Sequence, residues 1–408
     1  MIACVAIAAC GSGSGTADTR PKPVEACRGD HGDPSTVVAF DARTGLVKWE
    51  RTAGTGGKLA KAGTFVVVGG GDGLVRAFDL DTGDQRWCAP GGPTVASTGA
   101  LAITGIPSTN SVVAYDNLSG AERWRADLGP MGAESASFER ALVADASGVY
   151  VGLTDRAASP DVLALDLEGK TRWTYDLAAC SGEPSANLPP APASADAPPP
   201  VFQACVGGGT PSMILAGTRL IVEDVNAGAL VALDTATGAA AWRLPIPASD
   251  GELRPQAADA SVVIAMRNPR SGPLLVGLDA SDGHELWSRP TGAFGIVMLD
   301  GSVVTVEQRS EGYTVTAIDS ITAAPRWNTA SLGSTYYPGA VAGSVLLPLG
   351  SDGLFALDAV TGDVRWRTAH RNPAQGGDTP DSTGYGSFVG DESVVVAVVT
   401  AVAHHEGD

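Results

Sequence analysis

The chain has 408 residues, and 44% of them are hydrophobic, which is enough apolar material for a full globular core. The formal net charge of −18 argues against a nucleic-acid partner, because such a partner needs a basic face. Glycine (52 residues) and proline (27 residues) are abundant, as expected of many short strands joined by turns.

The N-terminal segment predicts export. Residues 1–10, MIACVAIAAC, form an apolar run that ends at Cys10, and Ile7-Ala8-Ala9-Cys10 resembles the lipobox of bacterial lipoproteins. No basic residue precedes Cys10, so we interpret 1–10 as a truncated signal segment with lipidation at Cys10, followed by a flexible tether over 11–36. This predicts a lipoprotein anchored on the extracytoplasmic side of a bacterial envelope; the alternative is a chance apolar N-terminus.

Eight copies of one pattern organise the rest of the chain, and each of the eight tryptophans ends one copy. Successive tryptophans are separated by 38, 37, 49, 69, 45, 40 and 39 residues, a period of about 40 that is typical of a four-stranded propeller blade. The sequence therefore predicts an all-β fold, one eight-bladed β-propeller over 37–402, with an insertion loop over 177–204 and a tail over 403–408. The copies are AFDARTGLVKW (39–49), AFDLDTGDQRW (77–87), AYDNLSGAERW (114–124), ALDLEGKTRW (164–173), ALDTATGAAAW (232–242), GLDASDGHELW (277–287), AIDSITAAPRW (317–327) and ALDAVTGDVRW (356–366).

Each copy is expected to form a β-hairpin. An apolar strand leads to an aspartate that can accept hydrogen bonds from turn amides, a threonine follows, and a glycine supplies a positive φ. The aspartates are Asp41, Asp79, Asp116, Asp166, Asp234, Asp279, Asp319 and Asp358. The residue before the tryptophan is often basic, which we assign to charged outermost strands that resist edge pairing; these residues are Lys48, Arg86, Arg123, Arg172, Arg326 and Arg365.

The two ends of the chain are expected to close the ring together. The first copy has only outer-strand sequence before it, whereas 387–389 and 393–399 are apolar strands with no tryptophan copy behind them. Pairing the C-terminal inner strands with the N-terminal outer hairpin would complete the eighth blade and leave no free end in the ring.

The pattern AxDxxTGxxxW resembles the tryptophan-docking motif of the PQQ-like, quinoprotein-type propeller repeat, over nearly the whole chain. The resemblance implies that the tryptophans pack between neighbouring blades as structural residues: Trp49, Trp87, Trp124, Trp173, Trp242, Trp287, Trp327 and Trp366. The copies depart from the pattern in four places. Copy four is one residue short, copy seven has Ala323-Ala324-Pro325 at the glycine, and Ser119 and Asp282 replace threonine.

The cysteines fit an exported chain. With Cys4 removed and Cys10 lipidated, four remain, and an even number favours two disulfides. Cys180 and Cys205 flank the Pro/Ala-rich insertion and are expected to pair, which leaves Cys27 with Cys88. The alternative is four free thiols.

The sequence carries no recognisable catalytic set. PQQ-dependent dehydrogenases share the repeat, and many of them resemble one another in an adjacent Cys-Cys pair and a bound Ca²⁺, but this chain has no adjacent cysteine pair. We therefore assign no catalytic residue, no metal and no cofactor, with PQQ and Ca²⁺ as the alternative. Glu223, Asp224 and Glu307 follow apolar strands and are weak candidates for site residues.

The plan resembles that of the BamB-type envelope lipoproteins, which implies a non-enzymatic, monomeric scaffold that binds envelope proteins. Two alternatives stay open: a PQQ-dependent dehydrogenase and a ligand-sensing propeller.

Overall fold

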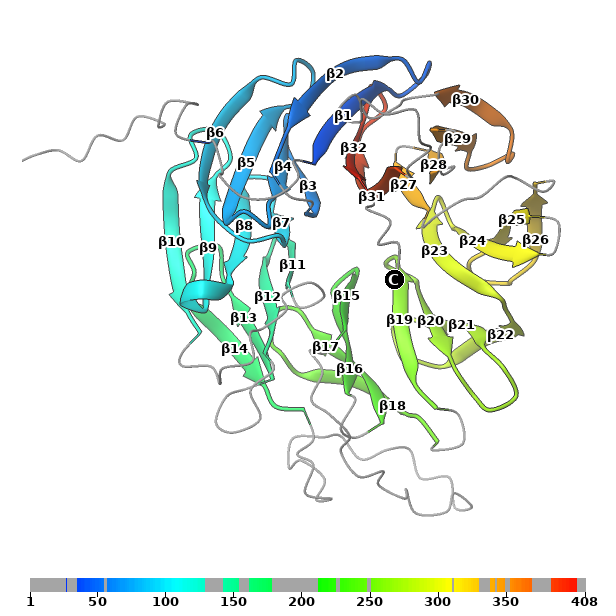
Figure 1. Ribbon diagram of the computed structural model, residues 1–408. Helices are drawn as coiled ribbons and strands as arrows, with labels where there is room; N and C mark the ends of the chain where they lie inside the picture. Colours follow the sequence, from blue (N-terminus) through cyan, green and yellow to red (C-terminus); the bar gives the residue numbers. More distant parts are fainter. Residues whose placement is uncertain are drawn as a thin grey trace, which may run out of the picture.

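The computed structural model describes residues 27, 35–54, 57–128, 142–153, 161–177, 212–224, 228–247, 251–309, 312–329, 338–341, 343–348, 353–368 and 383–401. These residues form eight four-stranded antiparallel sheets, arranged as blades around a central axis (Figure 1). The predicted eight-bladed β-propeller is confirmed. Among the described residues, no helix has the length and apolar character needed to cross a membrane.

Seven blades are continuous in the chain, and each runs from the axis outward in strand order. Blade 1 consists of β3 (Leu59–Ala62), β4 (Phe65–Gly69), β5 (Leu74–Asp79) and β6 (Gln85–Pro90). Blade 2 consists of β7 (Val95–Ser97), β8 (Leu101–Ile106), β9 (Ser111–Asp116) and β10 (Glu122–Asp127). Blade 3 consists of β11 (Leu142–Asp145), β12 (Gly148–Gly152), β13 (Val162–Leu165) and β14 (Thr171–Tyr175). A short 3₁₀ turn, Pro107–Thr109, lies between β8 and β9.

Blades 4 to 7 repeat this order. They are β15 (Met213–Ala216), β16 (Arg219–Asp224), β17 (Ala229–Asp234) and β18 (Ala240–Pro245); β19 (Leu253–Ala258), β20 (Val262–Arg267), β21 (Leu274–Asp279) and β22 (Glu285–Pro290); β23 (Ala293–Leu299), β24 (Ser302–Arg309), β25 (Gly312–Asp319) and β26 (Pro325–Asn328); and β27 (Gly339–Val341), β28 (Ser344–Pro348), β29 (Leu354–Asp358) and β30 (Val364–Thr368).

The eighth blade, here called the closing blade, joins both ends of the chain as predicted. Its strand order from the axis is β31 (Thr383–Gly390), β32 (Val394–Ala401), β1 (Thr36–Asp41) and β2 (Val47–Thr52). β1 pairs with β32 along its whole length, from Thr36 opposite Val399 to Asp41 opposite Val394. In Figure 1 the first strands, in blue, lie beside the last strands, in red.

The core lies between blades rather than within one of them. Each innermost strand contacts the innermost strand of the next blade, and β31 contacts β3, so the inner ring is closed. Apolar side chains from two neighbouring sheets interdigitate at each junction; one cluster joins Val37 and Val396 of the closing blade to Val66 and Phe78 of blade 1. This burial explains why the second and third strands of each blade are almost continuous apolar runs.

Candidate functional site

A ring of tryptophan hydrogen bonds links all eight blades. Each indole Nε1–H donates to the backbone carbonyl of the residue that follows the turn aspartate in the next blade. The pairs are Trp49 with Leu80 (3.0 Å), Trp87 with Asn117 (2.7 Å), Trp124 with Leu167 (2.8 Å), Trp173 with Thr235 (3.0 Å), Trp242 with Ala280 (3.0 Å), Trp287 with Ser320 (2.9 Å), Trp327 with Ala359 (2.9 Å) and Trp366 with Ala42 (2.8 Å). The last bond joins blade 7 to the closing blade, so the tryptophans act in interblade packing.

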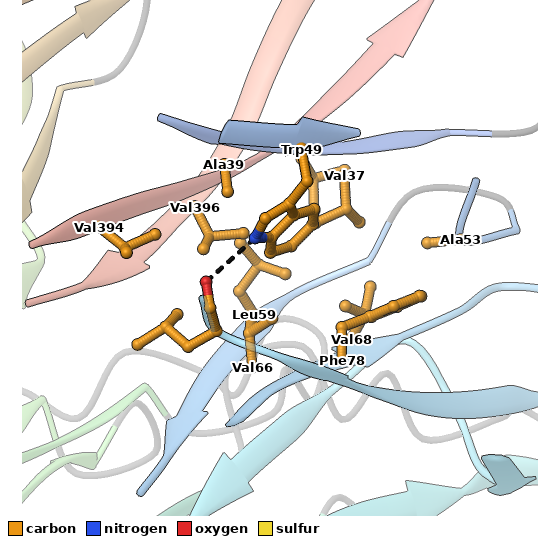
Figure 2. Packing of buried hydrophobic residues seen from close by; sticks show 12 residues of the cluster. Val37, Ala39, Trp49, Ala53, Leu59, Val66, Val68, Phe78, Val394 and Val396 are labelled. Atoms are coloured by element: carbon orange, nitrogen blue, oxygen red, sulfur yellow. Dashed lines mark hydrogen bonds between the residues drawn. The ribbon is translucent and has the colours of Figure 1, made fainter. Parts of the chain in front are cut away.

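The glycine of the next turn makes room for the indole in seven of the eight blades. Figure 2 shows Trp49 packed among apolar side chains of the closing blade and blade 1, with its bond to the backbone carbonyl of Leu80 dashed. Gly83 adopts φ +68°, and a Cβ added there would stand 2.5 Å from Cδ2 of Trp49. This position therefore needs glycine both for the backbone conformation and for the space.

The turn aspartates have a structural geometry. Asp41 Oδ1 accepts hydrogen bonds from the backbone N–H groups of Arg43 and Thr44 and from Thr44 Oγ1. The same three bonds recur at Asp116 with Leu118 and Ser119. The hydrogen bond from the Thr44 hydroxyl is the largest cause of the lowered pKa of Asp41, and the backbone N–H groups of Thr44 and Arg43 lower it further.

The basic residue before the tryptophan binds the aspartate of its own turn in four blades. Lys48 instead pairs with Asp81 of the next turn, and Arg172 donates to the carbonyls of Ser147 and Ala236. In blades 1, 2, 6 and 7 an arginine on the outermost strand pairs with the second carboxylate oxygen of the turn aspartate. These pairs are Arg86–Asp79 (2.9 Å), Arg123–Asp116 (2.7 Å), Arg326–Asp319 (2.8 Å) and Arg365–Asp358 (2.7 Å). A register shift in each outer pair, as between Ala77 and Phe78, leaves the basic residue unpaired in the ladder and directs it to the turn.

A disulfide fastens the segment that precedes β1. Cys27 and Cys88 are bonded across 61 residues of sequence, as predicted, and Cys88 lies on β6 of blade 1. The buried Arg76 donates to the Cys27 carbonyl and pairs with Asp72, whose side chain is 1% exposed. The predicted lipidation at Cys10, the expected Cys180–Cys205 bridge and the tail lie outside the described residues.

The two faces of the ring carry different kinds of connection. In an up-and-down blade, the turns after the first and third strands lie at one face, here the turn face, where the aspartate turns are. The loop after the second strand and the connection to the next blade meet at the opposite face, here the loop face. The connection between Tyr175 of β14 and Met213 of β15 begins and ends at this loop face.

A group of ionisable side chains lies at the loop face, where that long connection begins. We call Asp161, Tyr175, Asp224 and Arg243 the base cluster. Asp161 Oδ2 accepts the backbone N–H of Leu177 (2.6 Å), and the Glu223 N–H donates to the carbonyl of Ser212 (3.0 Å). Both described ends of the connection are thus hydrogen-bonded to the blades beneath.

The base cluster is partly desolvated. Asp224 is 1% exposed and lies 3.5 Å from Arg243 Nη2. Burial raises the pKa of Asp161 to about 6, and the negative charges of Asp176 and Asp224 add to this shift. Burial also raises the pKa of Tyr175, with Asp224 contributing. The base cluster thus holds two carboxylates, Asp161 and Asp224, and one guanidinium, a balance that favours a further cationic group beside it. The weak candidate Asp224 belongs to the cluster, and the weak candidate Glu223 precedes it on β16.

The described innermost strands carry no donor set for a metal-bound quinone. The charged residues of the described innermost strands are Lys61, Asp145 and Arg254. Lys61 pairs with Asp391 at 3.1 Å, and Asp145 caps its own turn at Ser147. These residues offer no convergent carboxylates for a Ca²⁺ ion, which takes six to eight oxygen ligands, so we derive no step through PQQ.

Within the part of the chain that the structure describes, the group with ligand atoms close enough for a metal is Asp279, Asp282 and His284. It belongs to the exposed outer turn of blade 5, where Asp279 already accepts from Ser281 and Asp282 bonds His284 at 2.6 Å. The group is far from the axis by its place in the blade, and both aspartates already accept hydrogen bonds from within the turn.

Comparison with known proteins places the chain in a family. A family model described as outer membrane protein assembly factor BamB matches residues 33–187, 108–297 and 226–407. The chain belongs to this BamB-like, PQQ-type propeller family. Among solved structures it is similar to BamB from Moraxella catarrhalis (16% identity, TM-score 0.52, 84% of this chain and 96% of that one).

The chain is also similar to proteins that are named as dehydrogenases. Quinohemoprotein alcohol dehydrogenase from Comamonas testosteroni shares 13% identity with a TM-score of 0.54, over 92% of this chain and 78% of that one. Methanol dehydrogenase subunit 1 from Methylobacterium organophilum is 48% identical over 54 residues, 12% of this chain and 9% of that protein. At sequence identities of 16% and 13%, the likeness to these solved structures shows the fold. The family uses this fold both for assembly factors and for dehydrogenases.

Proposed function

We propose that this chain is a non-enzymatic binding scaffold of the bacterial cell envelope that holds a partner protein on its loop face. The observation that carries the proposal is the base cluster, with half-buried carboxylates at the root of the longest connection. Loops presented by a rigid ring are common binding elements. The Cys27–Cys88 disulfide favours an oxidising compartment outside the cytoplasm.

The chemistry of the base cluster favours a basic segment of the partner. Asp161 and Asp224 are partly or fully buried beside a single guanidinium, and Glu223 lies 3.8 Å from Arg254. A lysine or arginine from a partner would relieve the cost of keeping these carboxylates ionised in a desolvated site.

Site-specific photo-cross-linking in the native envelope tests the proposal. A photoreactive residue at Arg254, which is 46% exposed near the loop face, should give an adduct with a partner protein. The matched position is Ser281 in an exposed turn of the opposite face, which should give none. Asp161→Asn in the Arg254 probe should weaken the adduct several-fold. Equal adducts from both faces, or none from Arg254, would refute the loop-face scaffold.

The second candidate is a PQQ-dependent dehydrogenase, favoured by the 54-residue match to methanol dehydrogenase. Titration calorimetry of the chain with PQQ in the presence of Ca²⁺ separates the two. Absence of heat at several temperatures is expected of the scaffold. Stoichiometric binding at micromolar or tighter affinity would overturn the scaffold and lead to alcohols and aldoses as substrates.

A further inference from the structure

Asp161 is held at the loop face between the ends of two strands. Its backbone carbonyl accepts the N–H of Leu153, just beyond β12, at 2.8 Å. Its side-chain Oδ2 accepts the N–H of Leu177, two residues beyond β14, at 2.6 Å. Because Asp161 is bonded on both sides, its carboxyl group would have to break the Leu177 bond to turn out into solvent.

Blades 3 and 4 meet next to this carboxyl group. Val162 of β13 and Val222 of β16 are fully buried and belong to one apolar cluster, which also contains Leu177. Asp161 directly precedes Val162, and Asp224 lies two residues after Val222. The apolar junction between the two blades therefore desolvates both carboxyl groups.

Two carboxylates act on Asp161, one from each neighbouring element. Asp176 lies just beyond β14 and is exposed, and Asp224 ends β16 and is buried. Burial, followed by the negative charges of these two groups, raises the pKa of Asp161 to about 6. Glu223 precedes Asp224 on β16 and lies 3.8 Å from Arg254 of β19. Asp161 is therefore a carboxyl group that changes its charge near neutral pH.

The cationic group of the base cluster belongs to Asp224 rather than to Asp161. Arg243 Nη2 lies 3.5 Å from Asp224 Oδ2, and among the residues that the structure describes no cationic side chain lies within ion-pair distance of Asp161. Burial raises the pKa of Tyr175, which keeps this phenol neutral. The base cluster thus carries one net negative charge with Asp161 ionised and none with Asp161 protonated.

We propose that protonation of Asp161 controls the loop-face site: a lysine or arginine of the partner binds beside Asp161 while this carboxyl group is ionised and leaves when it is protonated. The inference rests on the proposed function and adds its regulation. A cation beside the ionised carboxyl group balances the charge of a desolvated cluster, whereas the neutral acid offers it no such gain. By linkage, binding of the cation lowers the pKa of Asp161 and releases a proton.

Binding of a dye-labelled tetralysine peptide to the 408-residue chain, followed by fluorescence anisotropy, tests the inference. Salt at about 0.15 M shortens the Debye length to about 8 Å and screens the acidic surface as a whole. The dissociation constant should rise about tenfold between about pH 7.5 and about pH 5, because a carboxyl group with a pKa of about 6 is ionised in roughly one molecule in ten at the lower pH. Calorimetry at about pH 6, in two buffers of different ionisation enthalpy, should show that binding releases protons.

Three variants separate Asp161 from other titrating groups. Asp161→Asn keeps an oxygen for the Leu177 N–H but cannot titrate, so it should bind tetralysine weakly and equally at both pH values. Asp176→Asn is the matched control, because it removes the same charge from a neighbouring exposed position and should keep most of the pH dependence. His284→Gln, in an exposed turn of the opposite face, should keep all of it.

Three results would overturn the inference: equal affinity of the parent chain at both pH values, a pH dependence that Asp161→Asn leaves intact, or no tetralysine binding at any pH. Cross-linking from the Arg254 probe at the same two pH values distinguishes this failure from failure of the scaffold. An adduct that is equally abundant at both would leave the scaffold standing and remove its control by Asp161. Peptide binding with the expected pH dependence but no adduct would do the reverse.

Discussion

The indole of Trp287 lies directly over Gly277, its partner across the β21–β22 pair, so that a Cβ added at Gly277 would overlap Cε2 of the indole. In the other seven blades the residue opposite the tryptophan is alanine, as with Ala39 and Trp49. The next turn also departs from the pattern: Ala323 stands where the others have glycine and adopts φ +56°. A methyl group has in effect moved from one side of the indole to the other.

This relationship predicts energetic coupling between positions 277 and 323. Gly277→Ala alone should destabilise the protein by about 1–3 kcal/mol, because the added methyl group overpacks the indole. Ala323→Gly removes the opposing methyl group and relieves the positive φ, so it should lower the cost of Gly277→Ala by at least about 0.5 kcal/mol. Free energies of unfolding in urea for the four chains measure the coupling, and strict additivity would contradict it.

Replacing a tryptophan should lower the free energy of unfolding most where its interblade hydrogen bond is shielded from water. Trp87 is 1% exposed and bonds the carbonyl of Asn117, which is 4% exposed. Trp87→Phe leaves that carbonyl unsatisfied and opens a void, so a loss of about 2–4 kcal/mol is expected. Trp124→Phe is the matched change at a partly exposed indole whose acceptor residue Leu167 is also exposed, and about 1 kcal/mol is expected. Urea unfolding compares them, and equal losses would contradict the explanation.

The closing blade should be indispensable. Deleting 386–402 removes β32 and exposes the apolar face of β1, including Val38 and Phe40, which are fully buried. The truncated chain should lose its cooperative thermal transition. Deleting only 403–408 is the control and should leave Tm unchanged. A 386–402 deletion with the parent Tm would show that β1–β32 pairing does not hold the ring together.

The turn carboxylates predict sensitivity to acid. Hydrogen bonds from Arg123 and Arg365 lower the pKa of Asp116 and Asp358 to about 2, from an ordinary value of 3.8. Their contribution to stability is complete above the unfolded pKa and is lost as the pH falls from about 4 to about 2. Each exposed pair is worth about 0.2–1 kcal/mol. Asp358→Asn should flatten the profile of Tm against pH in that range, whereas the exposed Glu392→Gln should not.

Asp161 predicts the opposite dependence. Burial raises its pKa to about 6, so the folded state binds a proton that the unfolded state releases, and stability falls as the pH rises from about 4 to about 6. Asp161→Asn keeps an oxygen for the Leu177 N–H and should raise Tm above pH 6 but not below pH 4. Asp176→Asn, at an exposed position, should change Tm less. A fall in Tm at pH 7 for Asp161→Asn would contradict this account.

Much of the ring could be predicted from the sequence because its contacts repeat. The spacing of Asp and Trp within each copy marks the outer hairpin, and the unpaired strands at 387–399 predict the closing blade. Two details were not visible in the pattern. Alternation alone placed Arg86 and Arg365 on a strand edge, whereas a bulge turns them toward Asp79 and Asp358. Glycine replaces alanine at position 277, and alanine replaces glycine at position 323. In the sequence these two departures from the repeat pattern lie in different copies and look independent.

The base cluster could not be assembled from the sequence for a different reason. Asp161, Tyr175, Asp224 and Arg243 come from two blades and four separate places in the chain, and none belongs to the repeated motif. The only signal was that Glu223 and Asp224 follow an apolar strand. Long-range placement of this kind depends on the ring geometry and on the ends of the Tyr175–Met213 connection.

The Cys27–Cys88 disulfide decides where a mechanical pull on the N-terminus would enter the ring. Without it, tension on the upstream segment would act on Thr36, the first residue of β1, and would peel β1 from β32 one hydrogen bond at a time. With it, the load passes from Cys27 into the middle of β6, a strand held in a sheet made from one continuous stretch of chain. The β1–β32 pairing, which joins the two ends of the chain, is thereby shielded from the force that an anchored N-terminus would transmit.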